Sequence, residues 1–86
     1  MRIRLADGTV IEGGTCGYSE GFLWCYFSGY TLQEAAGMFF DPEKTRMIRA
    51  EYGEMADVYE GFTNCVAFNM NMDGNISVCL KKGVIE

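Results

Sequence analysis

The stretch VAFNMNMDGNISVCL, residues 66–80, predicts the fold more strongly than any other part of the sequence. Apolar and polar residues alternate on either side of Asp73-Gly74, and an Asp-Gly pair between alternating segments is the strongest short-range signal for a β-hairpin. A three-residue loop with glycine in the left-handed conformation keeps the apolar residues on one face, whereas a two-residue loop would mix the faces. The expected pairs are Val66 with Leu80, Phe68 with Val78, and Met70 with Ile76.

Two more hairpins are expected from similar signals. Asp7-Gly8 predicts an N-terminal hairpin with the same three-residue loop. Its expected pairs are Ile3 with Ile11 and Arg2 with Glu12. Tyr52-Gly53-Glu54 predicts a third turn, with a register that places arginines opposite acids, because such cross-strand pairs are stabilising. The expected pairs of this hairpin are Ile48 with Val58, Arg49 with Asp57, and Arg46 with Glu60.

The segment between these hairpins predicts one more strand and a helix. FLWCYF, residues 22–27, is apolar on both faces and predicts a central strand, whereas the glycines within residues 13–17 predict a flexible connection. Thr31 and Glu34 match a capping box that begins a helix of about ten residues, and Asp41-Pro42 is expected to end it. The apolar stripe expected on this helix consists of Leu32, Ala35, Ala36, Phe39 and Phe40.

These elements predict a single α+β domain over residues 1–86. The expected architecture is an antiparallel sheet of six to seven strands built from hairpins, either open or barrel-like, with one short helix packed on it. One helix of about ten residues cannot cover so large a sheet. The uncovered face is therefore expected to close into a barrel, dimerise or bind a ligand. The residues expected on that face are Cys25, Cys65, Ala67 and Cys79.

The composition argues against several classes of protein. The chain has a net charge of −5 and no histidine. It therefore lacks both the basic surface that nucleic-acid binding needs and the usual general base and metal ligand. The cysteines are too widely spaced for a structural zinc site and are typical of small buried hydrophobic residues. We expect a protein that is not an enzyme and that binds no metal, cofactor or nucleic acid.

The N-terminus and the apolar runs predict a cytoplasmic protein. Residues 1–5 carry basic side chains without the apolar core of a signal peptide. No apolar run approaches the roughly 18 residues of a membrane span. In a reducing compartment the four cysteines are expected to stay free. The alternative is a disulfide between Cys65 and Cys79, although the expected register places these two residues only diagonally across the hairpin.

The acidic charge is concentrated in residues 34–60, which hold seven acids against three bases. Aromatic residues coincide with these acids from residue 52 onward. Aromatic and charged side chains that share a surface are typical of protein-binding sites. We expect a contact surface for a partner protein with a basic surface, and its residues are Tyr52, Glu54, Asp57, Tyr59, Glu60 and Phe62.

Five short motifs, in order along the chain, are LADGT (residues 5–9), YTLQEA (30–35), DPEKT (41–45), YEGFT (59–63) and ISVCL (76–80). In this order the sequence resembles small proteins encoded by phages and prophages of Gram-positive gut bacteria. The resemblance spans most of the chain, but its motifs are mainly turn and cap signals. It implies either a structural or assembly component of a phage or an accessory protein that blocks a host defence system, such as an anti-CRISPR.

The favoured function is that of a phage-derived, non-enzymatic binding protein that acts through the acidic and aromatic surface. One alternative is a homo-oligomer that binds a small ligand or nucleotide between subunits, as in a signal-sequestering protein. Another is a phage structural or assembly component. An enzyme that uses a lone cysteine is the least favoured, because the chain has no histidine to activate the thiol and no cysteine lies at the start of the predicted helix.

Overall fold

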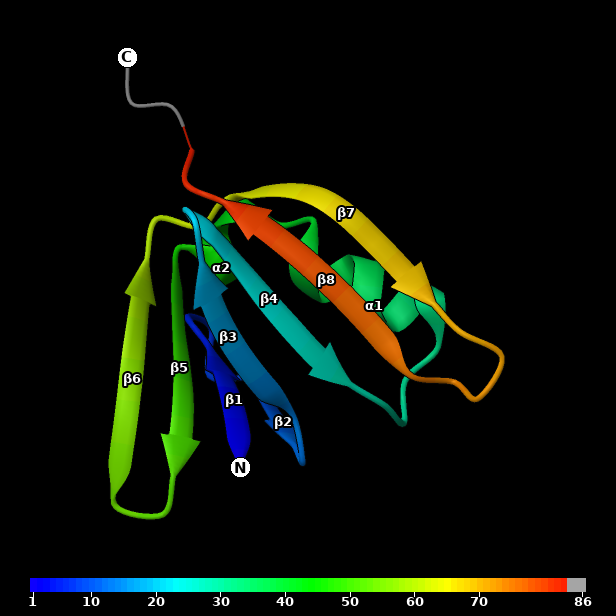
Figure 1. The fold of residues 1–86 in the computed structure, drawn as a ribbon, viewed down its shortest axis with the longest axis horizontal. Coiled ribbons are helices and arrows are strands. Elements are labelled where there is room, and N and C mark those ends of the chain that lie inside the picture. Colours follow the sequence, from blue (N-terminus) through cyan, green and yellow to red (C-terminus); the bar gives the residue numbers. More distant parts are fainter. Residues whose placement is uncertain (84–86) are drawn as a thin grey trace.

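The computed structural model describes residues 1–83 and contains eight strands and two helices in that range (Figure 1). The strands are β1 (Arg2–Leu5), β2 (Val10–Glu12), β3 (Thr15–Ser19), β4 (Phe22–Phe27), β5 (Met47–Tyr52), β6 (Met55–Glu60), β7 (Asn64–Met70) and β8 (Ile76–Lys81). The helices are α1 (Leu32–Phe39) and α2 (Pro42–Thr45). The strand pairs are antiparallel. The α+β class expected from the sequence is confirmed.

The strands form two four-stranded sheets rather than one. Sheet 1 has the order β2-β1-β5-β6, and sheet 2 has the order β3-β4-β8-β7. The expectation of a single sheet of six to seven strands, open or barrel-like, is therefore wrong. The chain first changes sheets at Gly13-Gly14, where Gly13 has a φ of 75° and a Cβ on Gly14 would lie 2.6 Å from Ile3 Cδ1. Glycine is required here because the backbone passes directly against the core.

Both Asp-Gly hairpins have the expected loop. In the first, Ile3 lies opposite Ile11 and Arg2 opposite Glu12, as predicted. In the last, the two expected pairs nearest the turn are confirmed, and they are Phe68 with Val78 and Met70 with Ile76. The pair of Val66 with Leu80 is wrong, because the register shifts between Cys65 and Ala67 and brings Cys65 opposite Leu80. Such a β-bulge adds one residue to a strand, and its position is not visible in the alternation pattern.

The register of the third hairpin, β5–β6, differs by one residue from the prediction. Ile48 lies opposite Tyr59, and Arg49 opposite Val58. The turn is tighter than expected, since Tyr52 pairs with Met55 and only Gly53 and Glu54 remain in the loop. A one-residue change moves every side chain of one strand to the other face, so the predicted pairing of arginines with acids is lost.

Strand β3 lies where the sequence predicted a flexible connection. It pairs with β4 through a two-residue turn, in which Glu20 and Gly21 have φ values of 54° and 87°. Two positive φ values are what a type I′ hairpin turn requires. The strand includes Gly17, and most of its side chains are exposed, which explains why no apolar alternation revealed it.

Helix α1 begins as expected, with Thr31 and Glu34 forming a capping box. Its buried residues are Ala35, Met38 and Phe39. The predicted stripe is therefore only partly correct, because Leu32 and Phe40 are exposed. The chain continues directly into α2, which Asp41 caps by accepting a hydrogen bond from the Glu43 backbone N–H.

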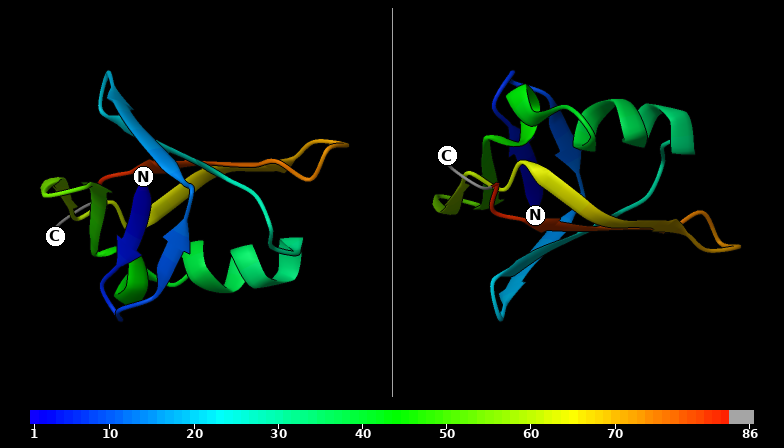
Figure 2. Two further views of the ribbon diagram at one scale, coloured as in Figure 1. Left: turned by 90° about the horizontal axis from the view of Figure 1, so that it is seen from below. Right: turned by 90° about the horizontal axis from the view of Figure 1, so that it is seen from above.

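One hydrophobic core joins both sheets and α1. Figure 2 shows α1 along one face of the β7–β8 hairpin, where the stacked rings of Phe27 and Phe39 lie 5.2 Å apart. The four residues expected on one uncovered face divide instead between two faces. Cys65 pairs with Leu80 on the core side, whereas Ala67 pairs with Cys79 on the other. Cys25 and Cys79 are buried, so the expected composition of the uncovered face is wrong.

Candidate functional site

The predicted contact residues lie on the β5–β6 hairpin and the segment that follows it. Figure 1 shows this hairpin at the side of the molecule, with its turn directed away from sheet 2. Strand β6 is an edge strand, and five of its six residues are exposed. Apart from Arg49, Gly53 and Ala56, the exposed residues of this hairpin are called the hairpin surface, and they are Tyr52, Glu54, Met55, Asp57, Val58 and Glu60.

The carboxylates of the hairpin surface have no ion-pair partner among residues 1–83. Arg49, which was expected to face Asp57, instead lies 3.9 Å from Glu51. Arg46, expected to face Glu60, lies 4.0 Å from Glu43. The shift in register therefore moves the arginines away from the acids of β6. The negative charge of the hairpin surface is left uncompensated within the described part of the chain.

Glu51 lies close to three arginines of sheet 1, on the face of β5 that it shares with Arg49. Its carboxylate lies 3.3 Å from Arg4 Nε, 3.7 Å from Arg2 Nε and 3.9 Å from Arg49 Nε. The Glu51 side chain is only 14% exposed, and its Oε1 has no hydrogen-bond partner among the described residues. The three arginines thus lie within 4 Å of Glu51, and in the described part of the chain none of them pairs with an acid of β6.

A groove of about 450 Å³ runs along the edge of β6 where the strand meets β3. We call it the edge groove, and it is lined by Tyr18, Val58, Tyr59, Glu60, Phe62 and Lys82. Its floor is aromatic. The stacked rings of Tyr18 and Tyr59 lie 6.4 Å apart, and both rings meet Phe62 edge-on. Lys82 Nζ lies 5.7 Å from the centre of the Phe62 ring.

Three of the six predicted site residues meet in the edge groove. Tyr59 and Glu60 line it from β6, and Phe62 is buried at its base. Tyr52, Glu54 and Asp57 lie farther along the hairpin and do not line it. Sequence reasoning missed Tyr18 and Lys82, which come from distant segments, and Val58, which was expected to face Ile48. Only Tyr18 had a signal, as an aromatic residue placed at a strand end.

The hydroxyl groups of Tyr52 and Tyr59 on the β5–β6 hairpin stay neutral. Loss of hydration, and then the negative charge of Asp57, raise the pKa of Tyr59. The same two causes, in the same order, raise the pKa of Tyr52. Both hydroxyls are therefore hydrogen-bond donors at physiological pH. Their arrangement suits binding rather than acid–base chemistry, since a general base needs a pKa near the working pH.

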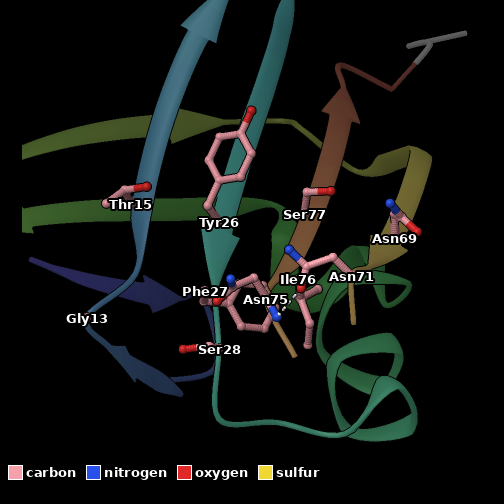
Figure 3. A pocket seen from close by; sticks show the side chains of 10 residues that line it. All are labelled: Gly13, Thr15, Tyr26, Phe27, Ser28, Asn69, Asn71, Asn75, Ile76 and Ser77. Atoms are coloured by element: carbon pink, nitrogen blue, oxygen red, sulfur yellow. Dashed lines mark hydrogen bonds between the residues drawn. The ribbon is translucent and has the colours of Figure 1, made fainter. Parts of the chain in front are cut away.

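A second groove, of about 550 Å³, lies at the far end of sheet 2 (Figure 3). We call it the neutral groove, because none of the described residues that line it is charged. The lining residues are Gly13, Thr15, Tyr26, Phe27, Ser28, Asn69, Asn71, Asn75, Ile76 and Ser77. Tyr26 stands on its face of β4 beside Thr15 and Ser77, and its ring stacks on that of Trp24 at 6.3 Å.

Within residues 1–83, no group of three or more Cys, Asp or Glu residues is placed to hold a metal ion. The four cysteines are free. The Cys65–Cys79 disulfide considered from the sequence is thus not formed, and these residues lie on opposite faces of sheet 2. In the same described range, no helix has the length and apolar character that crossing a membrane requires.

Comparison with known proteins adds no relative. No protein-family model matches the sequence, and neither a curated protein nor a solved structure matches it significantly. The resemblance to phage proteins and the function that it implies therefore stay predictions.

Proposed function

We propose that this chain is a non-enzymatic binding domain that takes a basic segment of a partner protein along the β5–β6 hairpin. One observation carries the proposal. Glu54, Asp57 and Glu60 lie on or beside an edge strand and have no ion-pair partner among the described residues. Uncompensated charge of one sign favours a partner with the opposite charge and speeds its association.

The backbone of β6 supplies a second means of binding. In sheet 1 this strand pairs with β5 on one side only. An edge strand presents unpaired N–H and C=O groups to which an extended peptide can add as a further strand. Met55 is 75% exposed and Val58 is 49% exposed, so the same strand also offers apolar contact to the added segment.

The edge groove favours arginine among the basic side chains of the partner. A guanidinium stacks on aromatic rings and forms paired hydrogen bonds with a carboxylate. Tyr18 and Tyr59 provide the rings, and Glu60 provides the carboxylate at the same groove. We therefore propose an extended segment with alternating basic residues, one of which is an arginine that enters the edge groove.

The resemblance to phage proteins directs this proposal toward a host protein. A component of a host defence system that holds nucleic acid has a basic surface, and an acidic protein bound there would block it. Inhibition of such a component, for example in a CRISPR system, is the form of the function that we propose. A structural role in a phage particle is the competing outcome.

The proposal can be tested with fluorescent peptides of extended sequence that carry arginine at alternate positions. Acidic peptides of the same length serve as decoys, and affinity is measured by anisotropy at low and high salt. We expect the triple variant Glu54→Gln, Asp57→Asn, Glu60→Gln to bind the basic peptides about tenfold more weakly, since three exposed ion pairs at about 0.5 kcal/mol each are lost. The preference should also decline at high salt.

The matched control removes charge elsewhere. Glu20 and Asp73 are exposed acids in the turns of sheet 2, so the variant Glu20→Gln, Asp73→Asn should bind like the unmodified protein. Circular dichroism establishes that all variants are folded. Equal affinity of both variants, or equal affinity for acidic and basic peptides, would contradict the proposal.

A second candidate function rests on the neutral groove. Hydroxyl and amide side chains surround an aromatic ring there, and the lining lacks the cation that a phosphate group needs. This chemistry favours an uncharged polar ligand, such as a saccharide or a nucleoside, over a nucleotide. The sequence-based alternative of a small-ligand protein is thus proposed in a narrower form.

Thermal shift measurements against neutral saccharides, nucleosides and their phosphates test this second function. We expect a neutral compound to raise the melting temperature, and the rise to disappear in Tyr26→Ala. Tyr18→Ala is the matched control, because Tyr18 is an equally exposed tyrosine of sheet 2 that lines the other groove. A response to phosphorylated compounds alone would contradict the neutral-ligand form. Light scattering on the same samples determines whether the protein is a dimer.

A further inference from the structure

Two of the four cysteines are brought together by the β3–β4 hairpin. Cys16 and Cys25 lie directly opposite each other in the register, and their Sγ atoms are 3.5 Å apart. The other two thiols have different surroundings. Cys65 Sγ donates a hydrogen bond to the Ala67 carbonyl at 3.4 Å, and Cys79 lies opposite Trp24 on the face of sheet 2 away from the core.

We propose that Cys16 and Cys25 are a redox modification site, at which the protein forms a cross-strand disulfide when it meets a small-molecule disulfide. Residues opposite each other on antiparallel strands have Cα atoms about 4.5 to 5.5 Å apart. This separation is inside the range of about 4.4 to 6.8 Å that a disulfide requires. The two sulfur atoms already touch, so the bond can form without moving either strand far.

The surroundings of the two thiols set the order of the reaction. Cys16 is partly exposed and can be reached by a small oxidant, whereas Cys25 is fully buried in the core. The hydrogen bond with Cys16, and then burial, raise the pKa of the Cys25 thiol well above its usual value. Since the thiolate is the nucleophile, Cys16 reacts first and Cys25 second.

The exchange proceeds in two balanced steps. The Cys16 thiolate attacks one sulfur of the small disulfide, which forms a mixed disulfide on Cys16 and releases one small thiolate. Cys25 then gives its proton to water and attacks Cys16 Sγ, which forms the protein disulfide and releases the second small thiolate. The protein loses two electrons and two protons, and the small disulfide is reduced to two thiols.

The bond would fasten an edge strand that is otherwise weakly held. Strand β3 lies at the edge of sheet 2, contains Gly17 and buries no side chain fully. It also carries Tyr18, which lines the edge groove. A link between β3 and β4 would therefore fix the strand that supplies one wall of this groove. Formation of the disulfide itself does not depend on what the groove binds.

The test uses the full-length protein, purified in the reduced state and then equilibrated with oxidised glutathione. After the remaining thiols are alkylated without reduction, a protease that cleaves after glutamate separates the two cysteines, because Glu12, Glu20 and Glu34 flank them. Before alkylation, the oxidised protein should have an intact mass lower by two hydrogen atoms than that of the reduced protein. After digestion, we expect a linked pair of fragments consisting of residues 13–20 and 21–34. Reduction should separate the two fragments again.

Two variants make the result specific. Cys16→Ser removes the exposed partner and should abolish the intramolecular disulfide, whereas Cys65→Ser should leave it unchanged. A bridge that involves Cys65 or Cys79 would overturn the proposal. So would a glutathione adduct that persists on Cys16 without bridging, a protein that stays fully reduced, or an intramolecular disulfide in Cys16→Ser.

Discussion

The β5–β6 and β7–β8 hairpins are built from the same secondary structure but have opposite surroundings. Strand β8 pairs on both sides, with β4 and β7, and four of its six residues are buried. Among residues 1–83, strand β6 pairs only with β5, and it has no fully buried residue. Helix α1 covers one face of the β7–β8 hairpin (Figure 2). In the described part of the chain, no helix covers the β5–β6 hairpin (Figure 1).

This difference separates the part of the molecule that holds the fold from the part that is available for contact. Burial of apolar area is the main favourable term in folding, and sheet 2 with α1 supplies much of it. Side chains on β6 can change with little effect on the core. An uncovered hairpin is therefore where a partner can bind without competing with the protein's own stability.

The same substitution on the two hairpins should have very different effects. Val78 on β8 is 0% exposed, whereas Val58 on β6 is 49% exposed. We expect Val78→Ala to lower the free energy of unfolding by about 2 kcal/mol through lost burial and a residual cavity. Val58→Ala should change it by less than about 0.5 kcal/mol. Urea denaturation measures both, and equal losses would mean that the two hairpins are equally important to the core.

A smaller change in stability is expected at Glu51, whose carboxylate lies close to three arginines. Glu51→Gln should lower the free energy of unfolding by about 1 kcal/mol, because its arginine partners are half-exposed and each contributes little. Glu60→Gln, which removes an unpaired acid on the same hairpin, should be neutral within about 0.5 kcal/mol. The loss in Glu51→Gln should shrink in high salt. A loss that is independent of salt would assign the role of Glu51 to packing instead.

The smallest effect distinguishes the two Asp-Gly turns. Asp7 Oδ1 accepts a hydrogen bond from the Thr9 N–H at 2.9 Å, whereas in the β7–β8 turn Asn71 Oδ1 accepts from Asp73 N–H and Asn75 N–H. The backbone hydrogen bond from Thr9, and then its hydroxyl, lower the pKa of Asp7 below the ordinary value of 3.8. The contribution of the Asp7 carboxylate to the free energy of unfolding is therefore present above that value and is lost as the pH falls through the folded-state pKa.

This contribution can be measured by comparing unfolding at pH 7 and at pH 3 or below. The stability difference between the unmodified protein and Asp7→Asn should narrow at the lower pH. Asn71→Ala should lower the free energy of unfolding by the same amount at both pH values, since the amide does not titrate. A gap for Asp7→Asn that is unchanged by pH would show that the carboxylate charge has no role in the turn.

The local signals in the sequence were sufficient where a turn and its strands lie together. The Asp-Gly loops, the pairs next to them and the Thr31 capping box are all as predicted. The predictions were wrong for the β5–β6 register and for strand β3. Salt-bridge pairing misplaced the β5–β6 register, because the two-residue turn and the burial of Ile48 outweigh exposed ion pairs. Strand β3 was missed because Gly17 interrupts it and four of its five residues are exposed, so no apolar alternation marks it.

The prediction of the candidate site likewise succeeded for residues that are neighbours in the sequence and not for distant ones. The sequence placed Tyr59, Glu60 and Phe62 together, and they do meet in one groove. It could not place Tyr18 or Lys82 there, because these residues are distant along the chain. The contact of Cys16 with Cys25 was hidden for another reason, because it depends on strand β3, which was not expected.

By itself, the sequence determined three of the four hairpins and where the helix begins, because turns and caps are decided by the few residues that form them. Only the tertiary structure decided that the hairpins divide between two sheets. Which strands lie side by side depends on burying apolar faces from distant segments together, and Ile3 and Leu80 join one core for that reason. The same choice left β6 at an edge, where its acids have no ion-pair partner in the part of the chain that the structure describes.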